Sequence, residues 1–198
     1  MTVIQSTGHR PDNQAKILDE IMPLTQCGFR MFRCAEWDKK PLARGWQREA
    51  TSDPDRLIRL FGGKPCNVGL ATGRGLVVLD VDGQPGQESL DRLESEHGPL
   101  PETARRRTGS GGMHWLFRTS SGQAIRSRSG IRMGLDVKAD GGLIVLPPST
   151  HPSGRRYQWE QHPSEGIAPL PAWLHTLLAE PTRRGIPMGR ARGSQRAV

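Results

Sequence analysis

Cysteine and long apolar runs are scarce in this 198-residue chain. The three cysteines are Cys27, Cys34 and Cys66. Their number is odd and the spacing of the first two is not that of a zinc knuckle, so we expect reduced thiols in a cytoplasmic protein. No apolar run approaches the length that crosses a bilayer, and the N-terminus has no apolar signal segment, so we expect no membrane partner.

Acidic residues are also outnumbered. The chain has 28 Lys and Arg against 20 Asp and Glu, for a formal net charge of +8. That sign favours a polyanionic partner, most often nucleic acid, although a basic protein that merely stays soluble has the same composition. The 24 glycines and 16 prolines predict many turns and short elements. The length suits one domain with appendages.

Apolar spacing and capping signals predict several helices. The best marked one has Asp53 as its capping acid, Pro54 in the first position and Gly62 at its end. The predicted helices span about 11–24, 54–61, about 87–96 and 171–179.

Short apolar runs beside turn residues predict strands. We expect two hairpins, one joining 67–73 to the strand that ends in Asp80 and Asp82, and one joining 135–139 to 143–146 across Asp140-Gly141. Other strands are expected over 27–34, 113–117 and, at an edge, 157–159. The arginine-bearing segment 122–134 is expected to be an exposed loop, and the basic tail from 181 onward to be disordered.

Two carboxylates follow the apolar strand that begins at Val77. Asp80 and Asp82 are two residues apart, so a strand points them to one face. Neighbouring carboxylates repel each other unless a positive charge lies between them, and hard cations such as Mg²⁺ or Mn²⁺ suit such ligands. A strand end with two solvated acids is the plain alternative. Asp136, on another strand, completes the minimum set for two divalent ions that activate a hydroxyl and neutralise pyrophosphate.

A phosphate-binding turn is predicted at Ser110-Gly111-Gly112, where backbone N–H groups can approach a ligand closely. His114 and Lys138 would add a donor and a positive charge. Taken alone, this sequence predicts a turn that binds no ligand, and a histidine such as His114 more often has a structural role.

Basic residues elsewhere are candidate contacts for nucleic acid, although solvated arginines on a loop explain any one of them equally well. Trp46 could stack on a base, but packing on the domain is the favoured interpretation. The candidate phosphate contacts are Lys40, Arg105, Arg106, Arg107 and Arg128.

These motifs, in this order, resemble the bifunctional primase–polymerase (Prim-Pol) domain of the archaeo-eukaryotic primase superfamily. The resemblance covers about 26–178. Its acid-x-acid motif is matched by Leu79-Asp80-Val81-Asp82, its histidine motif by Ser110-Gly111-Gly112-Met113-His114 and its third motif by Leu135-Asp136. Flanking segments are similar too: Lys40-Pro41, Gly45-Trp46, 67–69, 72–73, 137–142 and 147–149.

The resemblance implies an α/β (α+β) fold, in which a small N-terminal α/β unit packs on a palm-like, RRM-type mixed or antiparallel sheet that carries the catalytic acids. It implies a catalytic domain over 1–178 and a basic tail or linker over 179–198. Asp80, Asp82 and Asp136 would hold two Mg²⁺ or Mn²⁺ ions. Ser110, Gly111, Gly112 and His114 would bind the nucleotide, with Lys138 as a helper.

The implied reaction is nucleotidyl transfer by a DNA primase or polymerase. A primer 3′-hydroxyl would attack the α-phosphate of an NTP or dNTP on a single-stranded DNA template. No Cys and His set could form the zinc-binding insert of some relatives, so no zinc is expected. Relatives are often fused to a helicase, and nothing after Leu178 could be one, so we expect either a stand-alone enzyme or one part of a helicase fusion. Replication of a mobile element such as a plasmid or phage, repair and a CRISPR-linked role all remain open.

Two other functions remain open. Asp80-Val81-Asp82-Gly83 also resembles the first motif of haloacid dehalogenase-type phosphatases, but Gln84 stands where Thr or Val is usual, and no later lysine precedes paired acids. A replication or defence module that binds nucleic acid or nucleotide without turnover is the other alternative. Metal-dependent incorporation of nucleotides separates it from an enzyme.

Overall fold

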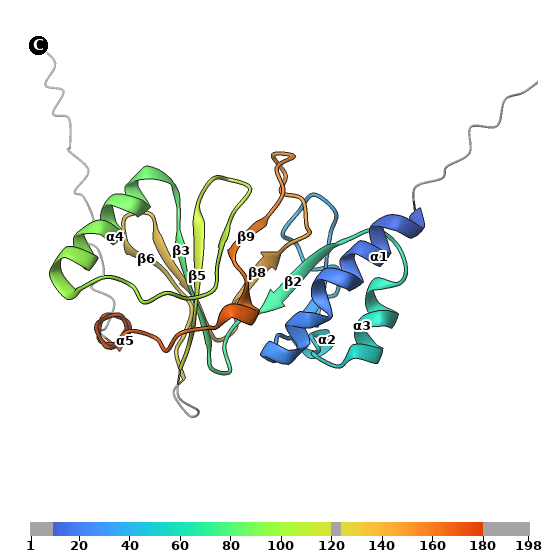
Figure 1. Ribbon diagram of the computed structural model, residues 1–198, viewed down its shortest axis with the longest axis horizontal. Coiled ribbons are helices and arrows are strands. Elements are labelled where there is room, and N and C mark those ends of the chain that lie inside the picture. Colours follow the sequence, from blue (N-terminus) through green and yellow to red (C-terminus); the bar gives the residue numbers. More distant parts are fainter. Residues whose placement is uncertain (1–9, 120–123, 180–198) are drawn as a thin grey trace, which may run out of the picture.

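The computed structural model describes residues 10–119 and 124–179. Two antiparallel sheets organise this part of the chain (Figure 1). The smaller sheet has the order β1-β2-β8, formed by Met31–Cys34, Asn67–Ala71 and Leu143–Leu146. The larger has the order β6-β7-β3-β5-β4-β9, formed by Arg128–Arg132, Leu135–Lys138, Leu76–Val81, Met113–Arg118, Arg105–Arg107 and Gln158–Gln161. The architecture is α+β, as predicted.

The helices divide between the two sheets (Figure 1). The N-terminal unit around the small sheet contains α1 (Arg10–Ile21), α2 (Trp46–Glu49) and α3 (Pro54–Phe61), with a 3₁₀ turn at Pro23–Cys27. The large sheet carries α4 (Gly83–His97) and α5 (Ala172–Ala179), and a 3₁₀ turn at Pro163–Glu165 follows β9.

The central strand β3 is buried on both faces, since every one of its residues is buried. Its odd-numbered residues, such as Leu79, pack with Leu90 of α4 and Leu174 of α5. Its even-numbered residues Leu76 and Val78 pack with the N-terminal unit. The period of two in a strand therefore sends Asp80 to the face that meets the N-terminal unit.

The predicted helix 54–61 is confirmed. The Asp53 side chain accepts a hydrogen bond from the backbone N–H of Arg56 at 2.9 Å, and Pro54 takes the first helical position. The edge strand predicted near 157–159 is also confirmed as β9. The helix expected over about 87–96 begins earlier, at Gly83.

Both predicted hairpins are wrong. β2 and β3 belong to different sheets and meet only in an isolated bridge between Gly73 and Leu76. β8 pairs with β2 rather than with β7, because Ile144 and Leu146 complete the core of the N-terminal unit. Each predicted turn is thus a crossover between the two sheets.

Part of the segment predicted as an exposed loop is also a strand: β6 pairs with β7 at the edge of the large sheet. The prediction for the tail from 181 onward lies outside the described residues. Within the described residues, no helix has both the length and the apolar character needed to cross a membrane.

Candidate active site

The strand register places four ionisable residues in one row across the large sheet. Asp80 of β3 pairs directly with Asp136 of β7 on one side and with His114 of β5 on the other. His114 pairs in turn with Arg106 of β4. Directly paired residues of antiparallel strands share a face, so all four side chains point the same way. The sheet thus joins residues that lie up to 56 positions apart.

Asp80 is the centre of this row and is only 8% exposed. Its Oδ1 lies 2.9 Å from His114 Nε2, and its Oδ2 lies 3.5 Å from Lys138 Nζ. Burial on its own would raise the pKa of Asp80, but His114, Lys138 and Arg106 together lower it to about 2. Asp80 is therefore a carboxylate at neutral pH.

Arg106 fixes the protonation of His114. Its Nη2 lies 2.7 Å from His114 Nδ1. Because a guanidinium can only donate, Nδ1 must accept, and the single ring proton is on Nε2, facing Asp80. Burial, with the charge of Arg106 as the next cause, lowers the pKa of His114 to about 4. His114 is thus a neutral donor at neutral pH.

Arg106 itself is wholly buried. Its guanidinium lies 4.7 Å from the centre of the Tyr157 ring, and Nε and Nη1 have no hydrogen-bond partner in the described part of the chain. Burial lowers its pKa to about 9, which leaves it charged at neutral pH. The prediction that Arg106 follows nucleic-acid phosphates on the surface is wrong, because the alternation along β4 turns it inward.

Lys138 bridges two carboxylates. Its Nζ lies 2.7 Å from Asp136 Oδ2, in addition to its contact with Asp80. Asp136 Oδ1 accepts from the backbone N–H of Gly130 at 2.7 Å. Burial opposes ionisation of both groups, but their mutual contacts lower the pKa of Asp136 and raise that of Lys138. Both are therefore charged.

Asp82 stands apart from this network. It follows the last residue of β3 and precedes α4, where its side chain makes no capping hydrogen bond. It has no ion pair in the described part of the chain. Burial, then the charges of Asp80 and Asp136, raise its pKa. A carboxylate in this position is stabilised by a cation.

A cavity of about 230 Å³ connects these groups. Its lining includes Asp80, Asp82, His114 and Lys138, together with Lys39 and Tyr157. Residues of β8 close it from the side of the small sheet. Asp136, by contrast, is not among the residues that line the cavity.

The predicted set of metal ligands is only partly assembled. Among the described residues, no group of three His, Cys, Asp or Glu side chains is arranged to hold a metal ion. Lys138 occupies the position between Asp80 and Asp136. The donors nevertheless suit a hard cation: Asp82 lines the cavity, makes no ion pair in the described part of the chain and has a raised pKa, and Asp80 beside it is ionised. The chemistry of the donors therefore fits Mg²⁺ or Mn²⁺.

The Ser110-Gly111-Gly112 turn lies against the end of β3. The backbone N–H of Gly112 donates to Thr108 Oγ1 at 2.9 Å, and that of Gly111 donates to the Thr108 carbonyl at 3.0 Å. These two N–H groups are used within the turn, so they do not form the predicted phosphate cradle as they stand. The exposed Ser110 shares its hydroxyl with Thr108. A Cβ at position 112 would lie 2.4 Å from the Val81 carbonyl oxygen, so a residue larger than glycine does not fit here without a shift of the backbone.

Two loops, around 37–40 and 150–153, border this turn. The Asn67 side chain joins them by donating to the Asp38 carbonyl at 3.0 Å and to the Thr150 carbonyl at 2.7 Å. Ser153 Oγ donates to the Gly109 carbonyl at 3.0 Å. Trp37 is 55% exposed here. In the sequence, one of these loops is marked by the run Trp37-Asp38-Lys39-Lys40. Of this run, only Lys40 was predicted to contact nucleic acid.

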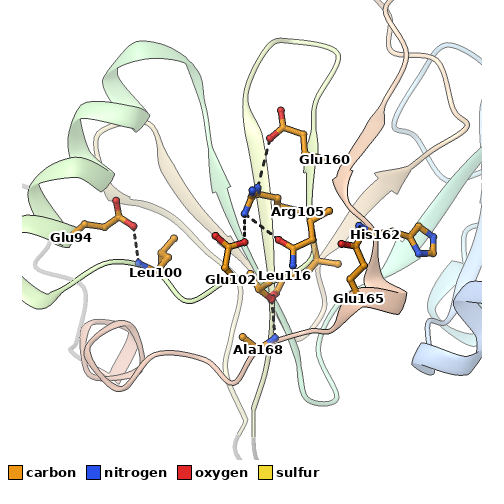
Figure 2. Close-up of polar contacts among 11 residues, drawn as sticks. Glu94, Leu100, Glu102, Arg105, Leu116, Glu160, His162, Glu165 and Ala168 are labelled. Atoms are coloured by element: carbon orange, nitrogen blue, oxygen red, sulfur yellow. Dashed lines mark hydrogen bonds and ion pairs between the residues drawn. The ribbon is translucent and has the colours of Figure 1, made fainter.

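The remaining basic candidates differ in how free their charges are. Lys40 is exposed. Arg105 contacts Glu102 at 3.1 Å and Glu160 at 3.7 Å (Figure 2), and Arg107 also pairs with Glu160. Arg128 Nη1 donates to the Leu178 carbonyl at 2.9 Å. Arg105 and Arg107 are thus partly neutralised.

Trp46 stacks on Phe32, with 4.5 Å between the ring centres. The favoured interpretation, that Trp46 packs on the domain, is confirmed.

Comparison with known proteins identifies one family. A family model described as "Bifunctional DNA primase/polymerase, N-terminal" matches residues 23–173, which is most of the chain and includes every residue of the row across the sheet. No curated protein matches the chain significantly. The matched region contains both sheets, the cavity and the Ser-Gly-Gly turn. The chain therefore belongs to the Prim-Pol family of bifunctional DNA primase/polymerase domains.

Proposed function

We propose that this protein is a metal-dependent nucleotidyltransferase that synthesises or extends primers on a single-stranded DNA template. The observation that carries the proposal is the register of β3, which pairs Asp80 directly with Asp136 and with His114. This register brings two acids and a neutral imidazole together, Lys138 contacts both acids, and Asp82 follows at the end of β3. The family match supplies the reaction class.

Asp80, Asp82 and Asp136 are the residues that would hold the ions. Bound Mg²⁺ or Mn²⁺ would activate the attacking 3′-hydroxyl and neutralise the leaving pyrophosphate. The low pKa of Asp80 keeps this ligand ionised throughout the neutral range. The raised pKa of Asp82 reflects its burial and, next, the negative charges of Asp80 and Asp136, which a cation would offset.

The remaining groups suit the triphosphate. His114 lines this cavity as a neutral ring, with its Nε2 proton facing Asp80, and so adds no positive charge. Lys138 and Lys39 line the same cavity and supply the positive charge. Ser110 lies exposed at the adjoining turn. We assign these residues to binding of the incoming NTP or dNTP.

A second candidate is a binding module without turnover. It is favoured by one observation: the Lys138 ammonium contacts both Asp80 and Asp136 and offsets part of their negative charge without a metal ion. Such a module would bind nucleotide or nucleic acid in the same cavity. Incorporation of nucleotide distinguishes the two.

The test is a primer-extension assay on single-stranded DNA with labelled nucleotides, in Mg²⁺ or Mn²⁺, with and without a primer. We compare the wild type with Asp80→Asn plus Asp82→Asn, which keeps the side-chain shapes. The matched control is Asp19→Asn plus Asp91→Asn, because both of these acids are exposed on helices outside the cavity. We expect incorporation by the wild type and the control and none by the first variant. A folded wild type that incorporates nothing in any lane would contradict the enzyme and favour the module.

A further inference from the structure

A second cavity, of about 180 Å³, lies at the other end of β3. Its lining includes Leu76 and Arg118, which pair across β3 and β5 as Asp80 and His114 do. Leu76 and Asp80 are four residues apart on one face, or about 13 Å along a strand. The same two strands therefore carry the candidate active site at one end and this cavity at the other, on the same face.

Positive charge dominates this second cavity. Arg30, Arg74 and Arg118 line it, against one carboxylate, Asp140. None of the three arginines makes an ion pair within residues 10–119 and 124–179. Burial, then the charges of Arg74 and Arg56, lower the pKa of Arg30. These cations repel one another, so an anion in the cavity would be stabilised.

Neutral partners hold two of the three arginines in place. Arg30 Nη2 donates to the carbonyls of Gln47 and Ala50, at 2.8 and 2.9 Å. Arg118 Nη2 donates to the Cys27 carbonyl, and its guanidinium lies 5.8 Å from the centre of the Phe29 ring. Such contacts orient the guanidinium groups without neutralising them. The cations are thus fixed before any ligand binds.

Arg74 is held in an unusual backbone conformation. Its φ is +52°, between Gly73 at +89° and Gly75 at +87°. Residues other than glycine rarely adopt positive φ, and such strain is typical of functional positions. The Asp140 carboxylate holds the turn by accepting from the Arg74 backbone N–H at 3.0 Å. The exposed Arg74 side chain makes no hydrogen bond or ion pair within the described residues.

We propose that this cavity binds a phosphate of single-stranded DNA at a site separate from the acid-lined cavity. Arginine forks match phosphate geometry, and Trp46, stacked on Phe32, adds an aromatic wall for a neighbouring base. The identity of the ligand as DNA rests on the proposed function. A strand held here would lie on the same face as Asp80.

The experiment measures equilibrium binding of a short fluorescein-labelled oligothymidylate by fluorescence anisotropy, in EDTA and without nucleotides. Arg74→Glu is compared with Arg92→Glu, which makes the same charge reversal at an exposed position of α4. We expect Arg74→Glu to weaken binding about tenfold and to reduce the slope of log Kd against log salt by about 0.7. Arg92→Glu should weaken binding less than about twofold. Arg74→Gln should act in the same direction as Arg74→Glu, by a smaller factor.

Equal effects of Arg74→Glu and Arg92→Glu, or no effect of either, would overturn the proposal, because diffuse charge would then explain the binding. Inorganic triphosphate is the competing probe. If it binds the wild type but not Arg74→Glu, while the oligothymidylate binds both alike, the cavity takes free phosphates instead of DNA. The assay contains neither metal nor nucleotide. A protein that binds DNA through Arg74 but never incorporates nucleotide would therefore refute the proposed function and leave this site intact.

Discussion

The neutral state of buried His114 has a measurable consequence for stability. In the folded protein its pKa is about 4, against an ordinary value of 6.5. Below pH 6.5 the unfolded chain takes up a proton that the folded protein does not. Stability contributed by the neutral ring is therefore complete above pH 6.5 and is lost as the pH falls towards 4. A fall in pKa of this size corresponds to about 3 kcal/mol of unfolding free energy.

The assay is urea unfolding of the wild type and of His114→Gln in EDTA, at pH 7 and at pH 4. Groups distant from His114 contribute equally to the two proteins, so the difference between their pH dependences reports on His114 together with its contacts to Asp80 and Arg106. We expect the wild type to lose about 3 kcal/mol more than the variant over this range. His175→Gln on α5 is the control and should behave as the wild type does. Equal pH dependence for the wild type and His114→Gln would refute the arrangement of Arg106, His114 and Asp80 described above.

Three further predictions concern single residues. Gly112→Ala should destabilise the fold by about 1–3 kcal/mol in urea unfolding, because its Cβ would meet the Val81 carbonyl oxygen; an unchanged midpoint would contradict the contact. Trp37→Ala should weaken single-stranded DNA binding about fivefold or more through lost stacking, and Trp37→Phe should retain most of it, without a change in thermal stability for either. Asp53→Ala should cost about 1 kcal/mol in urea unfolding, since the cap to Arg56 is lost, whereas Asp55→Ala should cost less.

Local signals predicted individual elements well. The cap at Asp53 and the apolar spacing of α3 are properties of neighbouring residues, and the structure has both. The strand pairings were predicted wrongly, because a hairpin is the simplest connection between two strands but not the only one. Ile144 and Leu146 pack in the core of the N-terminal unit, and nothing near them in the sequence specifies that partner.

In the candidate site, too, local sequence patterns were informative, whereas the pairing of the strands was not predicted. The spacing of Asp80 and Asp82 predicted a strand end with two acids, and His114 and Lys138 were chosen for the same cluster, in which the structure places them. Arg106 was predicted to contact nucleic-acid phosphates, as part of the basic run Arg105-Arg106-Arg107. Its burial depends on the register of β4 against β5, which the local sequence does not encode.

Template-directed incorporation of nucleotide tests the central claim most directly. Primer extension on single-stranded DNA should occur with the wild type in Mg²⁺ or Mn²⁺ and should stop on addition of EDTA. It should also be absent from Asp80→Asn plus Asp82→Asn, while that variant keeps its fold by circular dichroism. Undiminished extension by the double variant would contradict the assignment of the acids as the ligands of the catalytic ions.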